Sequence, residues 1–266
     1  MNTDEFARRY GPVAVVTGAS SGIGRGFAEL LAAKGLDLVL TARRQELLDE
    51  LASQLKAAHG TTCRTLALDL SRPDAAETIA AGTADLDVGL LVSNAGFPIT
   101  GNHAKVDGAE LTEMVLVNAL APLQLSRLFI PRLAARGHGG IIFTSSVEGF
   151  IGFPFSAAYS ATKGLVNSFG EALWAELKPH HIDVLTLCPG PTDTGAPVRV
   201  GIDIHQYPGV LTGAEAASVA LDNITEGPTV ISGGEFYVDM IDQLLAAPRR
   251  EALLDLAEKF AHHADH

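Results

Sequence analysis

Tyr159 and Lys163 stand four positions apart in the stretch Tyr-Ser-Ala-Thr-Lys. At that spacing two side chains share one face of a helix, and a helix is predicted here over 156–178. A free tyrosine is a poor acid or base at neutral pH because its pKa is about 10, so catalysis requires positive charge that stabilises the phenolate. Lys163 is placed to supply that charge. The pair predicts proton transfer by Tyr159, although the same spacing also occurs by chance in many helices.

Ser146 comes thirteen positions before Tyr159, just after an apolar run over 140–144 that predicts a buried strand. In doubly wound α/β folds, ligands bind at the carboxyl ends of the parallel strands. A serine hydroxyl at that position can hold the oxygen of a carbonyl or alcohol substrate. We therefore expect Ser146 to lie beside Tyr159 and Lys163.

A glycine-rich turn, Thr-Gly-Ala-Ser-Ser-Gly-Ile-Gly over 17–24, follows the first apolar run. Glycines let backbone N–H groups approach a pyrophosphate closely, and the N-terminus of the next helix adds partial positive charge. The spacing differs from the Gly-x-Gly-x-x-Gly of many dinucleotide-binding folds, and a turn of this kind can also be purely structural. The residues predicted to bind phosphate here are Gly18, Ser20, Ser21, Gly22, Ile23 and Gly24.

Arg43 and Arg44 end the second apolar run, about twenty residues after the turn. An NAD-binding fold places a carboxylate there for the ribose 2′-hydroxyl, and none is present. An arginine can instead hold the 2′-phosphate of NADP through charge-assisted, bidentate hydrogen bonds. The sequence therefore favours NADP(H). The alternative is that both arginines only open a solvated helix.

Short apolar runs alternate with longer amphipathic segments along the chain. The runs are 13–16, 36–40, 63–68, 88–92, 140–144, 182–187 and 229–231, and the clearest helical segments are 24–34, 45–59 and 111–136. Alternation of this kind predicts an α/β fold with a doubly wound, mostly parallel sheet, the Rossmann fold. We find no linker, low-complexity tract or repeat. One domain is expected over 1–266, with a core over 10–232 and a C-terminal helical extension over 233–266.

Composition and charge exclude several classes of protein. Hydrophobic residues make up 47% of the 266 residues, and 27 glycines follow no triplet period, which argues against disorder and against a fibrous chain. A net charge of −12 repels nucleic acid and anionic membrane surfaces. Cys63 and Cys188 lie in apolar runs and are expected to fill core. We also expect neither a signal peptide nor a stretch long enough to span a membrane, and hence a cytoplasmic location.

Several motifs together carry a resemblance to a known family. They are the turn over 17–24, Ser93-Asn-Ala-Gly96, Asn118, Ser146, Tyr159, Lys163 and Pro189-Gly190. In combination they resemble the short-chain dehydrogenase/reductase family over about residues 10–232. Arg43 stands where NADP-preferring members of that family carry a basic residue. Ser93 and Glu148 depart from the residues common at their positions.

The resemblance implies a catalytic set made of Asn118, Ser146, Tyr159 and Lys163. In it, Asn118 would anchor a water that links Lys163 to solvent, Ser146 would orient the carbonyl and Tyr159 would protonate it. It also implies NADP(H) as cofactor, no metal, and contacts beyond the phosphate turn. These contacts are Arg43, Asp69 and Leu70 at the adenosine end, Asn94, Ala95 and Gly96 along the cleft, Pro189, Gly190, Thr192 and Thr194 at the carboxamide, and Tyr159 and Lys163 at the nicotinamide ribose.

These observations predict an enzyme that interconverts a ketone or aldehyde and an alcohol by hydride transfer. Two alternatives are a catalytically idle NADP(H) sensor or scaffold and a non-redox epimerase or lyase on the same fold. The expected partners are a small carbonyl or alcohol substrate and further copies of the chain, as a homodimer or homotetramer through helices over 111–136 and 156–178.

Four segments bear on the substrate without fixing it. The aromatic residues of 149–155 either wall an apolar pocket or pack beneath their loop. Glu148 either meets a cationic substrate group or finds a donor within the protein. The stretch 194–210, with His205 and Tyr207, has the composition of a mobile lid. His262, His263 and His266 suggest metal only if other ligands join them, and a frayed tail is the simpler interpretation.

Overall fold

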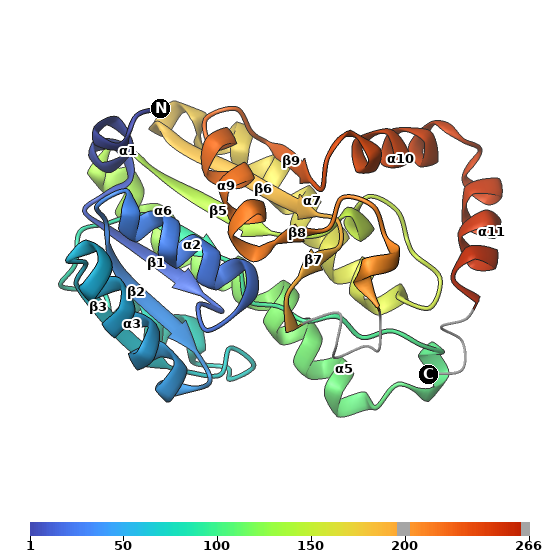
Figure 1. Cartoon of the computed structure of the whole chain (residues 1–266), viewed down its shortest axis with the longest axis horizontal. Helices are drawn as coiled ribbons and strands as arrows, with labels where there is room; N and C mark the ends of the chain where they lie inside the picture. Colours follow the sequence, from blue (N-terminus) through green and yellow to red (C-terminus); the bar gives the residue numbers. More distant parts are fainter. Residues whose placement is uncertain (196–202, 262–266) are drawn as a thin grey trace.

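The computed structural model of the protein describes residues 1–195 and 203–261. Its centre is a seven-stranded sheet in the order β3-β2-β1-β4-β5-β6-β9, in which every neighbouring pair is parallel (Figure 1). The strands are β1 Val13–Thr17, β2 Asp37–Ala42, β3 Cys63–Ala67, β4 Val88–Ser93, β5 Gly139–Thr144, β6 Ile182–Pro189 and β9 Thr229–Ser232. The expected doubly wound Rossmann sheet is confirmed, and the order reverses between β1 and β4, where such folds bind their ligands.

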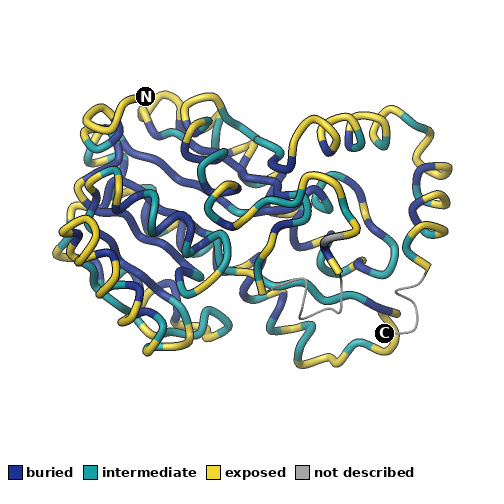
Figure 2. Tube along the Cα trace, in the orientation of Figure 1, coloured by how far each residue is buried: buried dark blue, intermediate teal, exposed yellow. Residues whose placement is uncertain are grey.

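Helices cover both faces of the sheet. One face packs against α2 Gly22–Ala33, α3 Gln45–His59 and α9 Gly213–Asn223, and the other against α4 Ala75–Ala81, α6 Ala121–Arg136 and α7 Ala157–Leu177. Side chains of a strand alternate between the faces: in β1, Ala14 and Val16 join the first core, whereas Val13 and Val15 join the second. Both strand faces are therefore buried, which explains the continuous apolar runs (Figure 2).

The helix expected over 111–136 is continuous from Gly108 to Arg136 but contains a turn of π-helix. The segments are α5 Gly108–Val115, the π-helical η2 Leu116–Leu120 and α6. By length and composition alone this helix could cross a membrane, so the expectation that no stretch is long enough is wrong. Half of its most apolar window is buried inside the protein, as in the core helix of many folds, and one such helix is weak evidence of a membrane span.

Both cysteines lie in strands, as expected, and both are free thiols. Cys188 in β6 is buried and donates to the Asn167 side chain at 3.3 Å. Cys63 is only partly buried because β3 is the edge strand of the sheet. Burial raises the pKa of the Cys63 thiol to about 11, so this side chain is protonated at neutral pH.

The N-terminal segment forms a helix, α1 Thr3–Tyr10, that the apolar pattern did not predict. Asp183 at the start of β6 holds it in place. Arg9 contacts the Asp183 carboxylate through Nε at 2.6 Å and Nη2 at 2.8 Å, and the buried Tyr10 hydroxyl donates to the same carboxylate at 2.6 Å. A short, two-turn helix is marginal alone, so these tertiary contacts account for its presence.

We expect Asp183→Ala to lower the free energy of unfolding by about 2 kcal/mol, because it leaves the buried Tyr10 hydroxyl without its acceptor. Urea unfolding measures the change. Arg72→Ala, which breaks the exposed Arg72–Asp74 pair, is the matched control and should leave the unfolding midpoint nearly unchanged. Equal effects of the two substitutions would contradict the assignment of Asp183 as the anchor of α1.

Candidate active site

The glycine-rich turn lies between β1 and α2, at the carboxyl end of the central strand. Gly18 and Gly22 have positive φ angles of 67° and 53°, a conformation that favours glycine. A Cβ on Gly18 would lie 2.9 Å from the Ala95 Cα, and one on Gly22 would lie 2.8 Å from the Thr194 Cγ2. The turn is therefore pressed between the segments after β4 and β6. Only glycine fits these two positions without displacing a neighbour.

The N-terminus of α2 suits an anion. Its first turn contains no acidic residue, and Ser21 at the N-cap makes no side-chain capping bond. Ser21 is exposed, and Gly22 and Ile23 are only partly buried. Unsatisfied N–H groups and the helix dipole together favour a phosphate at this end. The predicted phosphate-binding residues therefore fit the pyrophosphate of a dinucleotide.

Asn94 connects three strands at this end of the sheet. Its side-chain amide donates to the Thr17 carbonyl at 3.0 Å, and its side-chain carbonyl accepts the Thr144 hydroxyl at 3.1 Å. The Thr17 hydroxyl in turn accepts the backbone N–H groups of Asn94 and Ala95 at 2.9 and 3.0 Å. Sequence reasoning placed Asn94, Ala95 and Gly96 along the cofactor cleft but missed Thr17 and Thr144 as the residues that hold this segment.

The adenosine end of the predicted cleft is formed after β2 and β3. Arg43 follows β2 with a side chain that is 58% exposed, and its Nη1 contacts Glu113 of α5 at 3.1 Å. Asp69 follows β3 and accepts the backbone N–H and the hydroxyl of Ser71. Burial alone would raise the pKa of Asp69, but the Ser71 hydrogen bonds and the charges of Arg43 and Arg72 bring it below its usual value. Leu70 is partly buried beside it and packs against the core of the α4, α6 and α7 face.

Asn118 lies in the π-helical turn η2, where such turns often mark functional positions. Its side-chain oxygen accepts the Phe97 N–H at 3.0 Å, and its amide donates to the Phe97 carbonyl at 2.9 Å and to the Thr162 hydroxyl at 3.4 Å. Gly96 lies between Asn118 and Lys163, because a Cβ there would be 3.1 Å from the Asn118 Oδ1 and 3.3 Å from the Lys163 Nζ. The structure thus brings Asn118 beside Lys163.

Ser146, Tyr159 and Lys163 meet where β5 ends and α7 begins. The Ser146 hydroxyl oxygen accepts the N–H of Glu148 at 3.1 Å, and this hydroxyl lies close enough to Tyr159 to favour its phenolate. Lys163 is buried; its ammonium donates to the Thr144 carbonyl at 2.9 Å and lies 5.6 Å from the centre of the Tyr159 ring. Tyr159 itself is only partly buried, so its ring can meet a ligand.

In the protein alone, the electrostatics of this group do not lower the pKa of Tyr159. Burial and the nearby charge of Glu148 raise the pKa of Tyr159, which outweighs the Ser146 hydrogen bond. Burial also lowers the pKa of Lys163 to about 8. The ammonium lies 5.6 Å from the centre of the Tyr159 ring and donates to the Thr144 carbonyl, so one of its hydrogen bonds goes to the neighbouring strand. In the protein alone the site keeps Tyr159 protonated.

Comparisons with known proteins show which family the chain belongs to. The profile of the short chain dehydrogenase family matches residues 12–202. The chain belongs to the short chain dehydrogenase family. It is 36% identical over 192 residues to a very-long-chain 3-oxoacyl-CoA reductase of Danio rerio, covering 71% of this chain and 60% of that protein. It is 35% identical over 189 residues to a 7beta-hydroxysteroid dehydrogenase of Clostridium sardiniense, covering 71% and 72%.

Solved structures extend the likeness to nearly the whole chain. A 7beta-hydroxysteroid dehydrogenase structure superposes with a TM-score of 0.86 at 26% identity, covering 95% of this chain and 99% of that one. A short-chain dehydrogenase from Sphingobium yanoikuyae in complex with NADPH gives a TM-score of 0.78 at 30% identity, covering 92% and 95%. This short chain dehydrogenase therefore has the fold of a nicotinamide-dependent oxidoreductase. It spans less than two thirds of the length of the 3-oxoacyl-CoA reductase named above.

The segment after Ser146 packs in apolar clusters against the C-terminal helices of this short chain dehydrogenase. Val147, directly after Ser146, packs with Phe150 and with Tyr237 and Ile241 of α10 Glu235–Ala246. Phe153 is buried against α11 Arg249–Lys259 and the Phe260 ring, whose centre is 5.6 Å away. Of the two interpretations of 149–155, packing within the protein therefore holds for Phe153. Figure 1 shows α10 and α11 beyond the carboxyl ends of the strands, on the side opposite α1.

The segment after β6 lies against the phosphate turn. Pro189 ends β6, Gly190 and Thr192 follow, and Thr194 contacts Gly22. Two short strands that the sequence did not indicate, β7 Thr192–Asp193 and β8 Leu211–Thr212, pair here. The Tyr237 hydroxyl donates to the Pro208 carbonyl at 2.9 Å and fixes the end of the predicted lid to α10. Residues 196–202 of that lid, and the histidines at 262, 263 and 266, lie outside the described residues.

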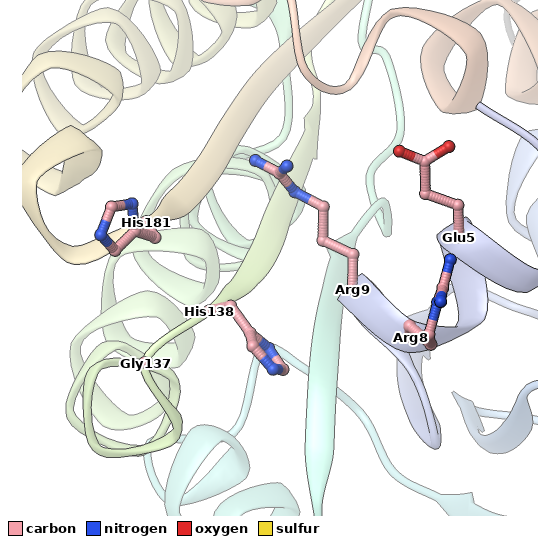
Figure 3. Close-up of a pocket in the computed structure, with 6 residues that line it drawn as sticks. All are labelled: Glu5, Arg8, Arg9, Gly137, His138 and His181. Carbon is pink, nitrogen blue, oxygen red and sulfur yellow. The ribbon is translucent and has the colours of Figure 1, made fainter.

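A separate pocket, drawn in Figure 3, has a volume of about 410 Å³. It is lined by Glu5, Arg8 and Arg9 of α1, by Gly137 and His138 before β5, and by His181 before β6. These segments lie at the amino ends of the strands, whereas doubly wound folds bind their ligands at the carboxyl ends. None of the predicted site residues lines this pocket, and no catalytic role follows from it.

Proposed function

We propose that this protein is an NADP(H)-dependent oxidoreductase that interconverts a ketone or aldehyde and an alcohol by hydride transfer, with Tyr159 as general acid and base. The observation that carries the proposal is the meeting of Ser146, Tyr159 and Lys163 beside a phosphate-binding turn. Family membership supports redox chemistry at a carbonyl or alcohol carbon. The protein positions the substrate and transfers the proton, and the bound nicotinamide supplies or accepts the hydride.

The side chains divide the work as follows. Because the Ser146 oxygen accepts the Glu148 N–H, its own proton is available to the substrate oxygen. Tyr159, held protonated by burial, donates its proton to the developing alkoxide in reduction and takes it back in oxidation. Lys163, fixed on the Thr144 carbonyl, lies beside the Tyr159 ring and can bond the nicotinamide ribose. Asn118 holds the backbone of Phe97, and so keeps the cleft segment in place beside Lys163.

Preference for NADP(H) is supported by Arg43. Its exposed guanidinium lies at the carboxyl end of β2, and Ala42 stands where an NAD-binding fold carries an acid. Asp69, the first carboxylate after β3, already accepts two hydrogen bonds from Ser71. The related structure from Sphingobium yanoikuyae was determined with NADPH. Together these support a 2′-phosphate site between Arg43 and the start of α3.

A bulky, hydrophobic ketone is the proposed substrate class. Val147, next to Ser146, packs in a buried apolar cluster with Phe150, Tyr237 and Ile241, so the surroundings of the proposed site are apolar. The relatives act, by their names, on 3-oxoacyl-CoA and on hydroxysteroids. Apolar surroundings with few polar groups suit a substrate of that kind.

Association between copies of this chain is also proposed, through α5, η2 and α7. Val115, Leu120 and Leu165 on these helices are exposed by 44%, 38% and 40%. Apolar side chains exposed on adjoining helices favour a self-complementary contact. The cytoplasmic location stays a prediction from the sequence.

The test is an assay of NADPH and NADH oxidation with a panel of small, aromatic and steroid-like ketones, read as loss of the reduced nicotinamide absorbance. We expect turnover with NADPH and a bulky ketone, and little with small ketones. Tight NADPH binding without turnover on any ketone, or on the matching alcohols with NADP⁺, would instead favour a cofactor sensor. Conversion of a substrate without net change in the nicotinamide would favour an epimerase or lyase.

A further inference from the structure

Glu148 is a carboxylate that the mechanism above uses only through its backbone. It lies in the short helix η3 Val147–Gly149, two residues after Ser146, and it is partly buried. The sequence left open whether it meets the substrate or a donor within the protein. In the structure its carboxylate lies near two hydroxyl groups at the start of α7, those of Ser156 and Ser160.

The carboxylate of Glu148 faces the first turn of α7. The Ser160 hydroxyl donates to its Oε2 at 3.4 Å, and the same hydroxyl oxygen accepts the Phe153 N–H at 3.1 Å. Ser156, the N-cap residue of α7, has a buried hydroxyl with no partner at hydrogen-bond distance. Burial raises the pKa of Glu148, and the nearby hydroxyls of Ser156 and Ser160 and the charge of Lys163 oppose that rise. The first turn of α7 has no acidic residue of its own, so Glu148 supplies negative charge to the positive end of this helix.

Glu148 thus contacts both halves of the catalytic group. Its N–H bonds the Ser146 hydroxyl oxygen at 3.1 Å, and its carboxylate bonds the turn in which Tyr159 precedes Ser160. We propose that Glu148 is a positioning residue that holds the Ser146 turn against the first turn of α7 and thereby sets the placement of Ser146 relative to Tyr159. This inference rests on the roles proposed above for those two residues.

The charge of Glu148 gives the proposal a readout that loss of packing would not produce. The titratable groups that face it are Tyr159 and Lys163 on α7 and Tyr207 in the segment over 203–210, while Cys188 in β6 lies near the first two. A negative charge disfavours the phenolate form of Tyr159. Oxidation of an alcohol needs that phenolate as base. Removal of the charge therefore lets oxidation begin at lower pH.

The experiment compares Glu148→Ala, Glu148→Gln and the wild type with the best ketone and its alcohol. Loss of the contact should lower kcat for reduction by Glu148→Ala by about tenfold, since small displacements of reacting groups have large effects on rate. The NADPH dissociation constant should stay within about twofold, because Glu148 makes no contact with the phosphate turn or Arg43. Glu148→Gln should restore reduction to within about threefold of the wild type and shift the rise of oxidation to lower pH.

Two results would overturn the inference. One is that Glu148→Ala and Glu148→Gln both have the kcat and the pH profile of the wild type. The other is a loss in Glu148→Gln as large as in Glu148→Ala, with an unshifted pH profile. If Glu148→Ala does not fold, as shown by loss of NADPH binding, the pH profile of Glu148→Gln decides alone. Absence of turnover in the wild type would refute the proposed function itself, so the two failures are distinguishable.

Discussion

Tyr159→Phe should lower turnover of the preferred ketone by about 10²–10⁴-fold, the usual contribution of a general acid, while NADPH binding changes by less than about twofold. The substitution removes the transferable proton and little volume. The contacts of Lys163 with Thr144 and of Ser146 with the Glu148 N–H do not involve the phenol oxygen and persist. Steady-state kinetics in both directions, with NADPH binding measured by fluorescence titration, separate the two effects.

Tyr207→Phe is the matched control for this variant. Tyr207 is partly buried near Glu148, and burial and that charge raise its pKa, as they do for Tyr159. Tyr207→Phe therefore tests whether loss of any tyrosine hydroxyl near Glu148 lowers turnover, or only loss of the Tyr159 hydroxyl. We expect Tyr207→Phe to keep most of the turnover. Retention of more than about a tenth of the activity by Tyr159→Phe would refute Tyr159 as the acid.

The sheet could be predicted from the sequence because its strands are buried on both faces. A parallel strand between two helical layers needs apolar side chains at every position, as in β1, β4 and β5, and such runs are visible without an alignment. The helix α1 gave no such signal, since its position depends on Arg9 and Tyr10 meeting Asp183, more than 170 residues later. Contacts at that separation cannot be read from local spacing.

The predicted catalytic residues lie together in the structure, but their electrostatics could not be predicted from spacing. The spacing of four positions in a helix places Tyr159 and Lys163 on one face. The direction of the Lys163 ammonium, however, depends on the Thr144 carbonyl of a neighbouring strand. Burial and Glu148, which set the Tyr159 pKa, are likewise tertiary effects. The π-helical turn that holds Asn118 has no sequence signature of its own, and the family resemblance, not the local pattern, singled out that residue.

The cofactor preference gives the second large effect. Arg43→Ala should lower kcat/KM for NADPH by about 10²–10³-fold and leave the value for NADH nearly unchanged, because two charge-assisted hydrogen bonds to a phosphate are lost. NADH offers only a 2′-hydroxyl at this position, so it has no such bonds to lose. Competition assays with the two nicotinamides measure the ratio directly.

The pair between Arg43 and Glu113 sharpens this test. Glu113 contacts the guanidinium at 3.1 Å on an exposed surface, so the 2′-phosphate must compete with a weak ion pair. Glu113→Gln removes the competitor and should strengthen NADPH binding by about twofold to fivefold at low salt, with a smaller gain at high salt because the charges are screened. Arg44→Ala is the matched control. It removes one positive charge from the neighbouring residue, the N-cap of α3, and leaves Arg43 in place. If Arg44→Ala impaired NADPH use as much as Arg43→Ala, the preference would come from the general charge of this edge, and Arg43 would not be a specific phosphate ligand.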